Sequence, residues 1–147
     1  MTDIDFPLPV DDFVKILGTS SAAETLGAKM GILVHEASPE RLVATMPVEG
    51  NTQPYGLLHG GASCVLAETL GSIGAAMHAG HDAITVGIEI NATHHRSATE
   101  GLVTAVATPL HLGRTLATYE ITVSDASGKR VCTARLSCMI RRNRAAA

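Results

Sequence analysis

The sequence predicts an α+β domain in which an antiparallel β-sheet wraps around one long central α-helix. From His59 onward, no cluster of Gly or Pro strong enough to end a helix occurs until Gly80, which predicts a single helix of about 20 residues. Two β-rich segments precede this helix and four follow it. Because only one helix is long enough to connect parallel strands, a doubly wound sheet is excluded, and an antiparallel sheet is the economical solution.

The N-terminal segment, residues 1–27, is expected to form an arm and short helices, and residues 28–147 the main domain. Residues 1–10 include two prolines and are expected to form a mobile arm. The predicted short helices run from Asp11 or Asp12 to Leu17 and from Ser20 or Ser21 to Leu26, with Gly27 ending the second.

Six segments have the residue types of β-strands. They are Met30–Ala37, Arg41–Val48, Ala83–Thr93, Leu102–Leu110, Thr115–Ser124 and Arg130–Ile140. The first two are joined by the turn residues 38–40, which predicts a hairpin. A second hairpin turn is predicted at Asp125–Gly128, where Gly128 is suited to positive φ.

Composition limits the class of protein. With 46% hydrophobic residues and no apolar run long enough to span a membrane, the 147 residues indicate one soluble globular domain. The acidic N-terminus lacks the apolar core of a secretory signal, and three cysteines without CxxC spacing favour reduced thiols, so a cytoplasmic location is expected. A net charge of −3 gives no support for nucleic acid binding.

The long helix has two unusual features. Apolar or small residues occupy every side of it, which predicts a helix surrounded by protein, with Glu68 as its one formal charge. A semi-buried carboxylate at this place would be hydrogen-bonded, protonated or kept for chemistry. The helix also opens on His59-Gly60-Gly61, and without side chains at the glycines a ligand can reach backbone N–H groups at the positive end of the helix dipole.

These residues resemble a known family. The matching positions are Gln53, Gly56, His59-Gly60-Gly61 and Glu68, and the similarity continues through Asn91–Ser97 and His111–Thr115. In type and spacing they resemble the hotdog-fold acyl-CoA thioesterases, among them the 4-hydroxybenzoyl-CoA thioesterases of the Arthrobacter type and the thioesterases of the phenylacetate and menaquinone pathways. The resemblance covers the chain from about residue 28 to the C-terminus.

The residue types suit thioester hydrolysis. The backbone N–H of Gly60 is placed to stabilise the oxyanion, and Glu68 can act as nucleophile or as general base on water. The resemblance implies the same roles and adds that Gln53 helps to hold the thioester. His59 either orients the substrate or fixes the start of the helix. The Ser72 hydroxyl is expected to hydrogen-bond the Glu68 carboxylate or a water, or else the Glu68 backbone carbonyl.

Two groups of residues at strand ends supply cations and hydroxyls, which suit phosphates. They are His94, His95, Arg96 and Ser97 in one segment, and His111, Gly113, Arg114 and Thr115 in the other. The resemblance implies that the coenzyme A nucleotide lies there. The alternative for each group is a solvated edge of the sheet.

Spacing along the helix predicts a shared active site. Gly60 and Glu68 are eight residues apart, which is about 12 Å along the axis, so one thioester carbon cannot contact both groups of the same helix. Two chains must then combine, and the resemblance implies a site at a dimer interface within a tetramer.

No cofactor and no metal are expected, because His78 and His81 have no further ligands at a spacing that completes a zinc site. The alternatives to an acyl-CoA thioesterase are a hotdog protein that binds acyl-CoA without hydrolysing it, a hotdog dehydratase, and a thioesterase for misacylated carrier proteins. The acyl group is expected to be aryl or hydroxyaryl by family analogy alone, and an aliphatic chain stays open. Its predicted slot is lined by Leu57, Gly71, Gly74, Ala75 and Met77.

Overall fold

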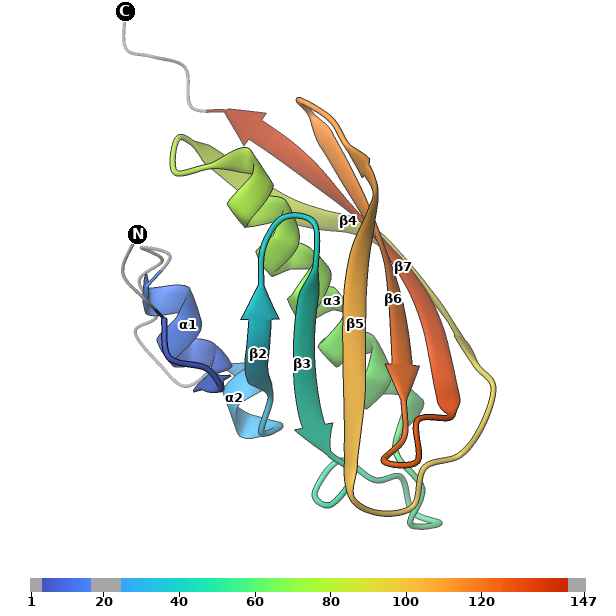
Figure 1. Cartoon of the computed structure of the whole chain (residues 1–147). Coiled ribbons are helices and arrows are strands. Elements are labelled where there is room, and N and C mark those ends of the chain that lie inside the picture. The colour runs from blue at the N-terminus through green and yellow to red at the C-terminus, as the bar shows by residue number, and fades with distance from the viewer. Residues whose placement is uncertain (1–3, 17–24, 143–147) are drawn as a thin grey trace, which may run out of the picture.

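The fold is organised around helix α3 (Gly60–Ala79), which crosses one face of the sheet in the computed structural model (Figure 1). The structure describes residues 4–16 and 25–142. The ring of His59 caps α3, because its Nδ1 accepts the N–H of Gly61 at 2.8 Å. The helix ends at Gly80, whose φ of 79° lies in the left-handed region that favours glycine. The predicted long helix is confirmed, with His59 as its cap.

In the described part of the chain, seven strands form one sheet in the order β1-β2-β3-β5-β6-β7-β4. Their bounds are β1 (Leu8–Pro9), β2 (Leu33–Ala37), β3 (Leu42–Pro47), β4 (Ala83–His94), β5 (Leu102–Leu112), β6 (Leu116–Ser124) and β7 (Arg130–Arg142). Every neighbouring pair is antiparallel, which confirms the predicted α+β architecture. Strand β4 lies at one edge of the sheet.

The β6–β7 hairpin forms at the predicted turn. The Asp125 carboxylate accepts the N–H groups of Ser127 at 2.9 Å and of Lys129 at 3.0 Å, and Gly128 has a φ of 79°. Strand β5 runs further than predicted, because a bulge between Pro109 and His111 lets pairing with β6 continue to Leu112.

The N-terminal segment differs from its prediction. The expected mobile arm contains strand β1, in which Leu8 pairs with Val34 of β2. The ring of Phe6 packs against that of Phe13, with ring centroids 5.9 Å apart. These two contacts attach the described part of the arm, from residue 4, to the domain.

The two short helices also start and end elsewhere. Helix α1 (Val10–Ile16) begins before the predicted caps, so that Asp11 and Asp12 lie in its first turn. Helix α2 (Leu26–Lys29) is capped by Thr25, and Gly27 is wrong as a stop because it lies inside α2. The remaining predicted bounds, Leu17, Ser20 and Ser21, lie outside the described residues.

The core lies between α3 and the sheet, and glycines in α3 let the two approach closely. A Cβ on Gly71 would lie 2.6 Å from Leu136 Cδ2, and one on Gly74 would lie 2.6 Å from the ring of Tyr119. The Tyr119 hydroxyl donates to the Pro39 carbonyl at 2.7 Å. Gly71, Gly74 and Ala75 are buried, so their predicted role in an acyl slot is wrong.

One side of α3 is only partly covered by this chain, so in the single chain the helix is not surrounded by protein as predicted. Gly61 and Glu68 are exposed, and Cys64, Thr69 and Ser72 on the same side are partly exposed. We call these five residues the open stripe. Glu68 is therefore not semi-buried in the single chain: apolar composition alone cannot tell a side that faces the sheet from one that faces another molecule.

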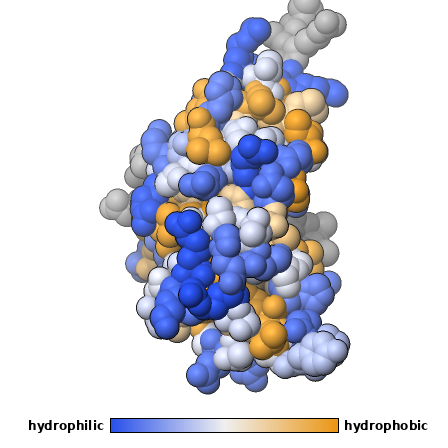
Figure 2. Space-filling model, turned by 90° about the vertical axis from the view of Figure 1, so that its right-hand side faces the viewer, coloured by the Kyte–Doolittle hydropathy of each residue, from blue (hydrophilic) through white to orange (hydrophobic). Residues whose placement is uncertain are grey.

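Seen from the right-hand side of Figure 1, the surface shows small groups of hydrophobic side chains separated by hydrophilic ones (Figure 2). At the edge of the sheet, β4 exposes three large apolar side chains, Ile84 at 54%, Val86 at 51% and Ile88 at 57%. Within the described ranges, no helix is both long and apolar enough to cross a membrane.

Candidate active site

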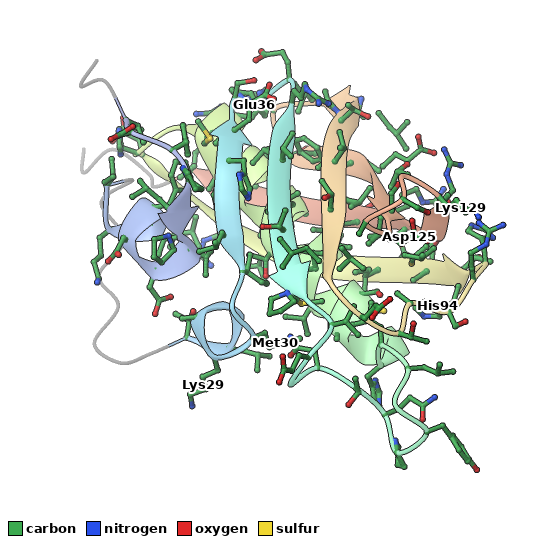
Figure 3. The ribbon with its side chains drawn as sticks, turned by 60° about the horizontal axis from the view of Figure 1, so that its bottom comes forward. Lys29, Met30, Glu36, His94, Asp125 and Lys129 are labelled. Atoms are coloured by element: carbon green, nitrogen blue, oxygen red, sulfur yellow. The ribbon has the colours of Figure 1, made fainter. Side chains whose placement is uncertain are left out.

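A cavity of about 420 Å³ opens at the N-terminal end of α3, and we call it the helix-start cavity. It gathers residues from the loop before α3, from the first turn of α3, and from the segment that follows β4. Its lining consists of Gln53, Leu57, Leu58, Gly60, Ser63, His94, His95, Arg96, Ser97, Ala98 and Val131. The structure thus brings together Gln53, Gly60 and the whole first group of predicted CoA-binding residues. Figure 3 shows His94 at the end of β4.

The backbone N–H of Gly60 is available to a ligand. The N–H of Gly61 donates to His59 Nδ1, and those of Ala62 and Ser63 donate to the His59 carbonyl. Among the described residues, the Gly60 N–H has no protein acceptor. A Cβ at position 60 would lie 2.8 Å from His94 Nε2, so a glycine leaves room for this imidazole beside the helix start.

Gln53 and His59 are both tied into the loop around the cavity. Gln53 Oε1 accepts the N–H of Tyr55 at 2.6 Å, so the NH₂ of its carboxamide is the part that can donate to a ligand. Two roles were predicted for His59, and the cap described above supports the one in which it fixes the start of the helix. Its backbone N–H donates to the Asn51 carbonyl at 2.9 Å, which also fixes the loop.

Two basic side chains of the cavity, Arg96 and His95, are held by residues of β7. Arg96 Nη1 donates to the Arg130 carbonyl at 3.1 Å, and His95 Nε2 lies 3.0 Å from Thr133 Oγ1. The sequence analysis missed Arg130 because its contribution is a backbone carbonyl, which any residue type provides.

Glu68 lies in a second cavity, of about 300 Å³, which we call the mid-helix cavity. Its lining consists of Val10, Asp11, Val14, Thr25, Gly27, Glu68, Thr69, Ser72 and Ile73. Ser72 accompanies Glu68 as predicted from their spacing. The two cavities share no lining residue, so the structure separates Glu68 from Gly60 within one chain.

Glu68 lies beside Gly87 of strand β4, and Ser72 lies beside Cys138 of strand β7. A Cβ on Gly87 of β4 would lie 3.0 Å from Glu68 Oε1, so this glycine leaves space for the carboxylate. Burial raises the pKa of the Cys138 thiol, and an interaction with the Ser72 hydroxyl opposes that effect. Ser72 therefore lies close to a thiol of β7 as well as to Glu68 in the same cavity.

The second group of predicted CoA-binding residues lies at the other end of α3. His78, in the last turn, has its Nε2 2.9 Å from the carbonyl of Gly113. Gly60 and His78 are 18 positions apart in α3, which corresponds to about 27 Å, so the structure does not bring the two predicted groups together in one chain. The exposed Arg114 and Thr115 follow Gly113 in the same turn, and the ring of His111 lies against Gly113.

The sequence analysis missed the wall of the mid-helix cavity. Val10, Asp11 and Val14 come from α1, and Thr25 and Gly27 from the start of α2. These residues are far from Glu68 in the sequence, so no short-range spacing pattern could predict that they lie beside it. Gly87 was missed for the same reason.

Metal and thiol chemistry find little support in the geometry. In the described ranges, no three His, Cys, Asp or Glu side chains gather closely enough to hold a metal ion. Burial raises the pKa of the Cys132 thiol to about 11 and also raises that of Cys64, so neither thiol is poised as a thiolate nucleophile at neutral pH.

Comparison with known proteins agrees with this geometry. Residues 55–132 match the model of the family described as the thioesterase superfamily. A Vibrio cholerae protein named "Putative esterase" is 46% identical over 132 residues, which are 89% of this chain and 87% of that protein.

Solved structures show the same fold. A thioesterase from Haemophilus influenzae superimposes with a TM-score of 0.82 at 31% identity, covering 95% of this chain and 94% of that one. A glutamine-to-alanine mutant of a thioesterase from Pseudomonas aeruginosa gives a TM-score of 0.78 at 38% identity, covering 91% and 94%. The family match, the relatives and the arrangement of one long helix on an antiparallel sheet lead to one conclusion: the chain belongs to the thioesterase superfamily and has the hotdog fold.

Proposed function

We propose that the protein hydrolyses acyl-CoA thioesters to a free acid and coenzyme A, without a cofactor. The observation that supports this most directly is the Gly60 N–H, which has no acceptor among the described residues and belongs to the lining of a 420 Å³ cavity that also contains His94 and Arg96. A donor of this kind, placed where an oxyanion develops, typically contributes about 3–4 kcal/mol to transition-state stabilisation.

In the proposed reaction, the thioester carbonyl oxygen accepts the Gly60 N–H, with the Gln53 NH₂ nearby to hold the thioester. Glu68 either attacks the carbonyl carbon or removes a proton from the attacking water. The C–S bond then breaks, and the sulfur of coenzyme A leaves as a thiolate that takes up a proton. Where water attacks, this step gives the free acid directly; where Glu68 attacks, it gives an acyl-Glu68 anhydride, which water then hydrolyses to the free acid and the Glu68 carboxylate. Ser72 lies one turn beyond Glu68 in the same cavity and is proposed to orient that carboxylate or the water.

Each site is proposed to combine the helix-start cavity of one chain with the Glu68 of another. Three features support this: the separation of the two cavities, the open stripe on α3, and the exposed apolar residues on the edge strand β4. Unpaired edge strands readily pair with a second copy. Antiparallel pairing of two β4 strands centred near Asn91 would place Gly87 of one copy opposite His94 of the other, and hence Glu68 beside the other chain's Gly60.

The same antiparallel arrangement accounts for the divided CoA residues. The C-terminal end of one α3 would lie beyond the N-terminal end of the other. The Arg114–Thr115 turn of one chain and the His94–Ser97 segment of its neighbour could then contact the phosphates of one coenzyme A. A tetramer built from two such dimers is the assembly that we propose.

For the acyl group we propose an aryl or hydroxyaryl substrate, carried by coenzyme A in preference to a carrier protein. The test is incubation of the purified protein with benzoyl-, 4-hydroxybenzoyl- and hexanoyl-CoA and with the matching acyl carrier protein thioesters, while the released thiol is monitored. We expect release from CoA thioesters that is fastest with an aryl group and unchanged by EDTA. Tight binding of every thioester without thiol release would instead identify a binding protein and contradict the proposal.

A further inference from the structure

One wall of the mid-helix cavity is built by the N-terminal segment. Val10, Asp11 and Val14 of α1 face the cavity together with Thr25 and Gly27, opposite Glu68 and Ser72 of α3. Helix α1 is firmly attached, because Phe13 is fully buried and the Val10 N–H donates to the Ile32 carbonyl at 3.1 Å. The cavity beside Glu68 therefore has a fixed wall made by the same chain.

Asp11 is held in that wall by two hydrogen bonds from one residue. The Thr25 N–H donates to Asp11 Oδ2 at 3.0 Å, and the Thr25 hydroxyl donates to Asp11 Oδ1. These bonds, the hydroxyl bond first, lower the pKa of the Asp11 carboxyl, so it is ionised at neutral pH. The nearby Lys15 forms its own ion pair with Asp12 at 3.0 Å.

The charged side chains among the described residues that line the cavity have the same sign. Asp11 and Glu68 contribute carboxylates, and none of these described lining residues is Lys, Arg or His. Its remaining side chains are apolar, such as Val10, Val14 and Ile73, or carry hydroxyls, such as Thr69. The cavity therefore offers apolar contact and hydrogen bonds to a ligand, but no partner for a negative charge.

We propose that Asp11 is a specificity-determining residue which excludes acyl groups that end in a carboxylate. The inference rests on the proposed function, because it assumes that the acyl group enters the cavity beside Glu68. A second carboxylate brought into this cavity would meet two like charges, and no cation is among the described residues that line it. A neutral acyl group of the same length meets no such cost.

The test compares hexanoyl-CoA with adipoyl-CoA, which has the same number of acyl carbons and adds a terminal carboxylate. We expect the wild-type protein to favour hexanoyl-CoA in kcat/KM by about tenfold, because the terminal carboxylate of adipoyl-CoA meets two like charges in one cavity. Asp11→Asn keeps the side-chain volume and an acceptor for Thr25. It should raise the ratio of kcat/KM for adipoyl-CoA to kcat/KM for hexanoyl-CoA about tenfold, because it removes one of the two like charges.

The matched control is Asp12→Asn, which removes the same charge from the neighbouring position. Asp12 is exposed and is absent from the lining of the cavity, so this variant should keep the wild-type preference. Equal hydrolysis of both thioesters by the wild-type protein, or an unchanged preference in folded Asp11→Asn, would overturn the inference.

A binding measurement separates this inference from the proposed function. Calorimetry with S-hexyl-CoA and S-(5-carboxypentyl)-CoA, two thioethers that cannot be hydrolysed, requires neither turnover nor a variant. Weaker binding of the carboxylate form to the wild-type protein supports the inference even when no thioester is hydrolysed, in which case the proposed function alone fails. Equal binding of the two thioethers overturns the inference whether or not hydrolysis occurs.

Discussion

The two cavities along α3 have opposite chemistry. Among the described residues, the lining of the helix-start cavity includes Gly60, a carboxamide, imidazoles and a guanidinium, and no carboxylate. The described lining of the mid-helix cavity includes the carboxylates of Asp11 and Glu68, and no cation. One part can stabilise negative charge on a carbonyl oxygen, and the other can supply the nucleophile or base. Under the proposed function, one chain therefore carries two complementary half-sites, about 12 Å apart along the helix, and each needs the other from a second chain.

Glu68→Gln should have the largest effect on the mid-helix half-site. The amide keeps the volume of the side chain but is neither a nucleophile nor a base, so kcat should fall by about 10²- to 10⁴-fold. The measurement is steady-state hydrolysis of the best acyl-CoA, with circular dichroism to confirm folding. A kcat near that of the wild-type protein would show that the carboxylate is not part of the chemistry.

Gly60→Pro should damage the helix-start half-site by about 10²-fold in kcat, because it removes the N–H that would stabilise the oxyanion. Proline suits the first position of a helix, and the extended backbone of His59, with ψ of 130°, is compatible with a following proline. Gly60→Ala is the control, since it keeps the N–H but adds the Cβ that would crowd His94. If both variants lose the same activity, crowding and not the N–H explains the loss.

Gly87→Ala should also affect the mid-helix half-site, with a smaller fall in kcat than either substitution above. The added Cβ would lie 3.0 Å from Glu68 Oε1 and should displace the carboxylate, lowering kcat by about tenfold while folding is retained. In a Glu68→Gln background the same substitution should have no further effect on kcat. An equal loss in both backgrounds would show that Gly87 acts independently of Glu68.

Tyr119→Phe should leave both half-sites intact and should have the smallest effect of the substitutions considered. It removes the hydroxyl that donates to the Pro39 carbonyl at 2.7 Å, which should lower the free energy of unfolding by about 1 kcal/mol. For a chain of this length the midpoint of thermal unfolding should fall by about 2–4 °C. The activity of the folded fraction should not change; if it falls, the sheet behind α3 influences the site.

The sequence predicted the parts of the fold that depend on local signals. The span of α3, the antiparallel sheet and the Asp125–Gly128 turn follow from breakers, β-rich segments and turn residues. Burial of Glu68 was predicted wrongly, because the small residues that face the sheet, such as Gly74, look in sequence like those of the open stripe, such as Gly61. Likewise, no spacing relates Asp11 to Glu68, since a long-range contact brings them into one cavity.

The shared site is the central claim, and subunit complementation tests it most directly. Glu68→Gln lacks the carboxylate and Gly60→Pro lacks the N–H, so each variant alone should be inactive. In a mixed dimer, one site would inherit both defects and the other neither.

Refolding the two variants together in equal amounts should make about half of the dimers mixed, and half of the sites in those dimers are intact. About a quarter of the wild-type activity per site should therefore return. Mixed dimers that are folded and verified by mass spectrometry, yet show no recovered activity, would contradict the claim and place each site within one chain.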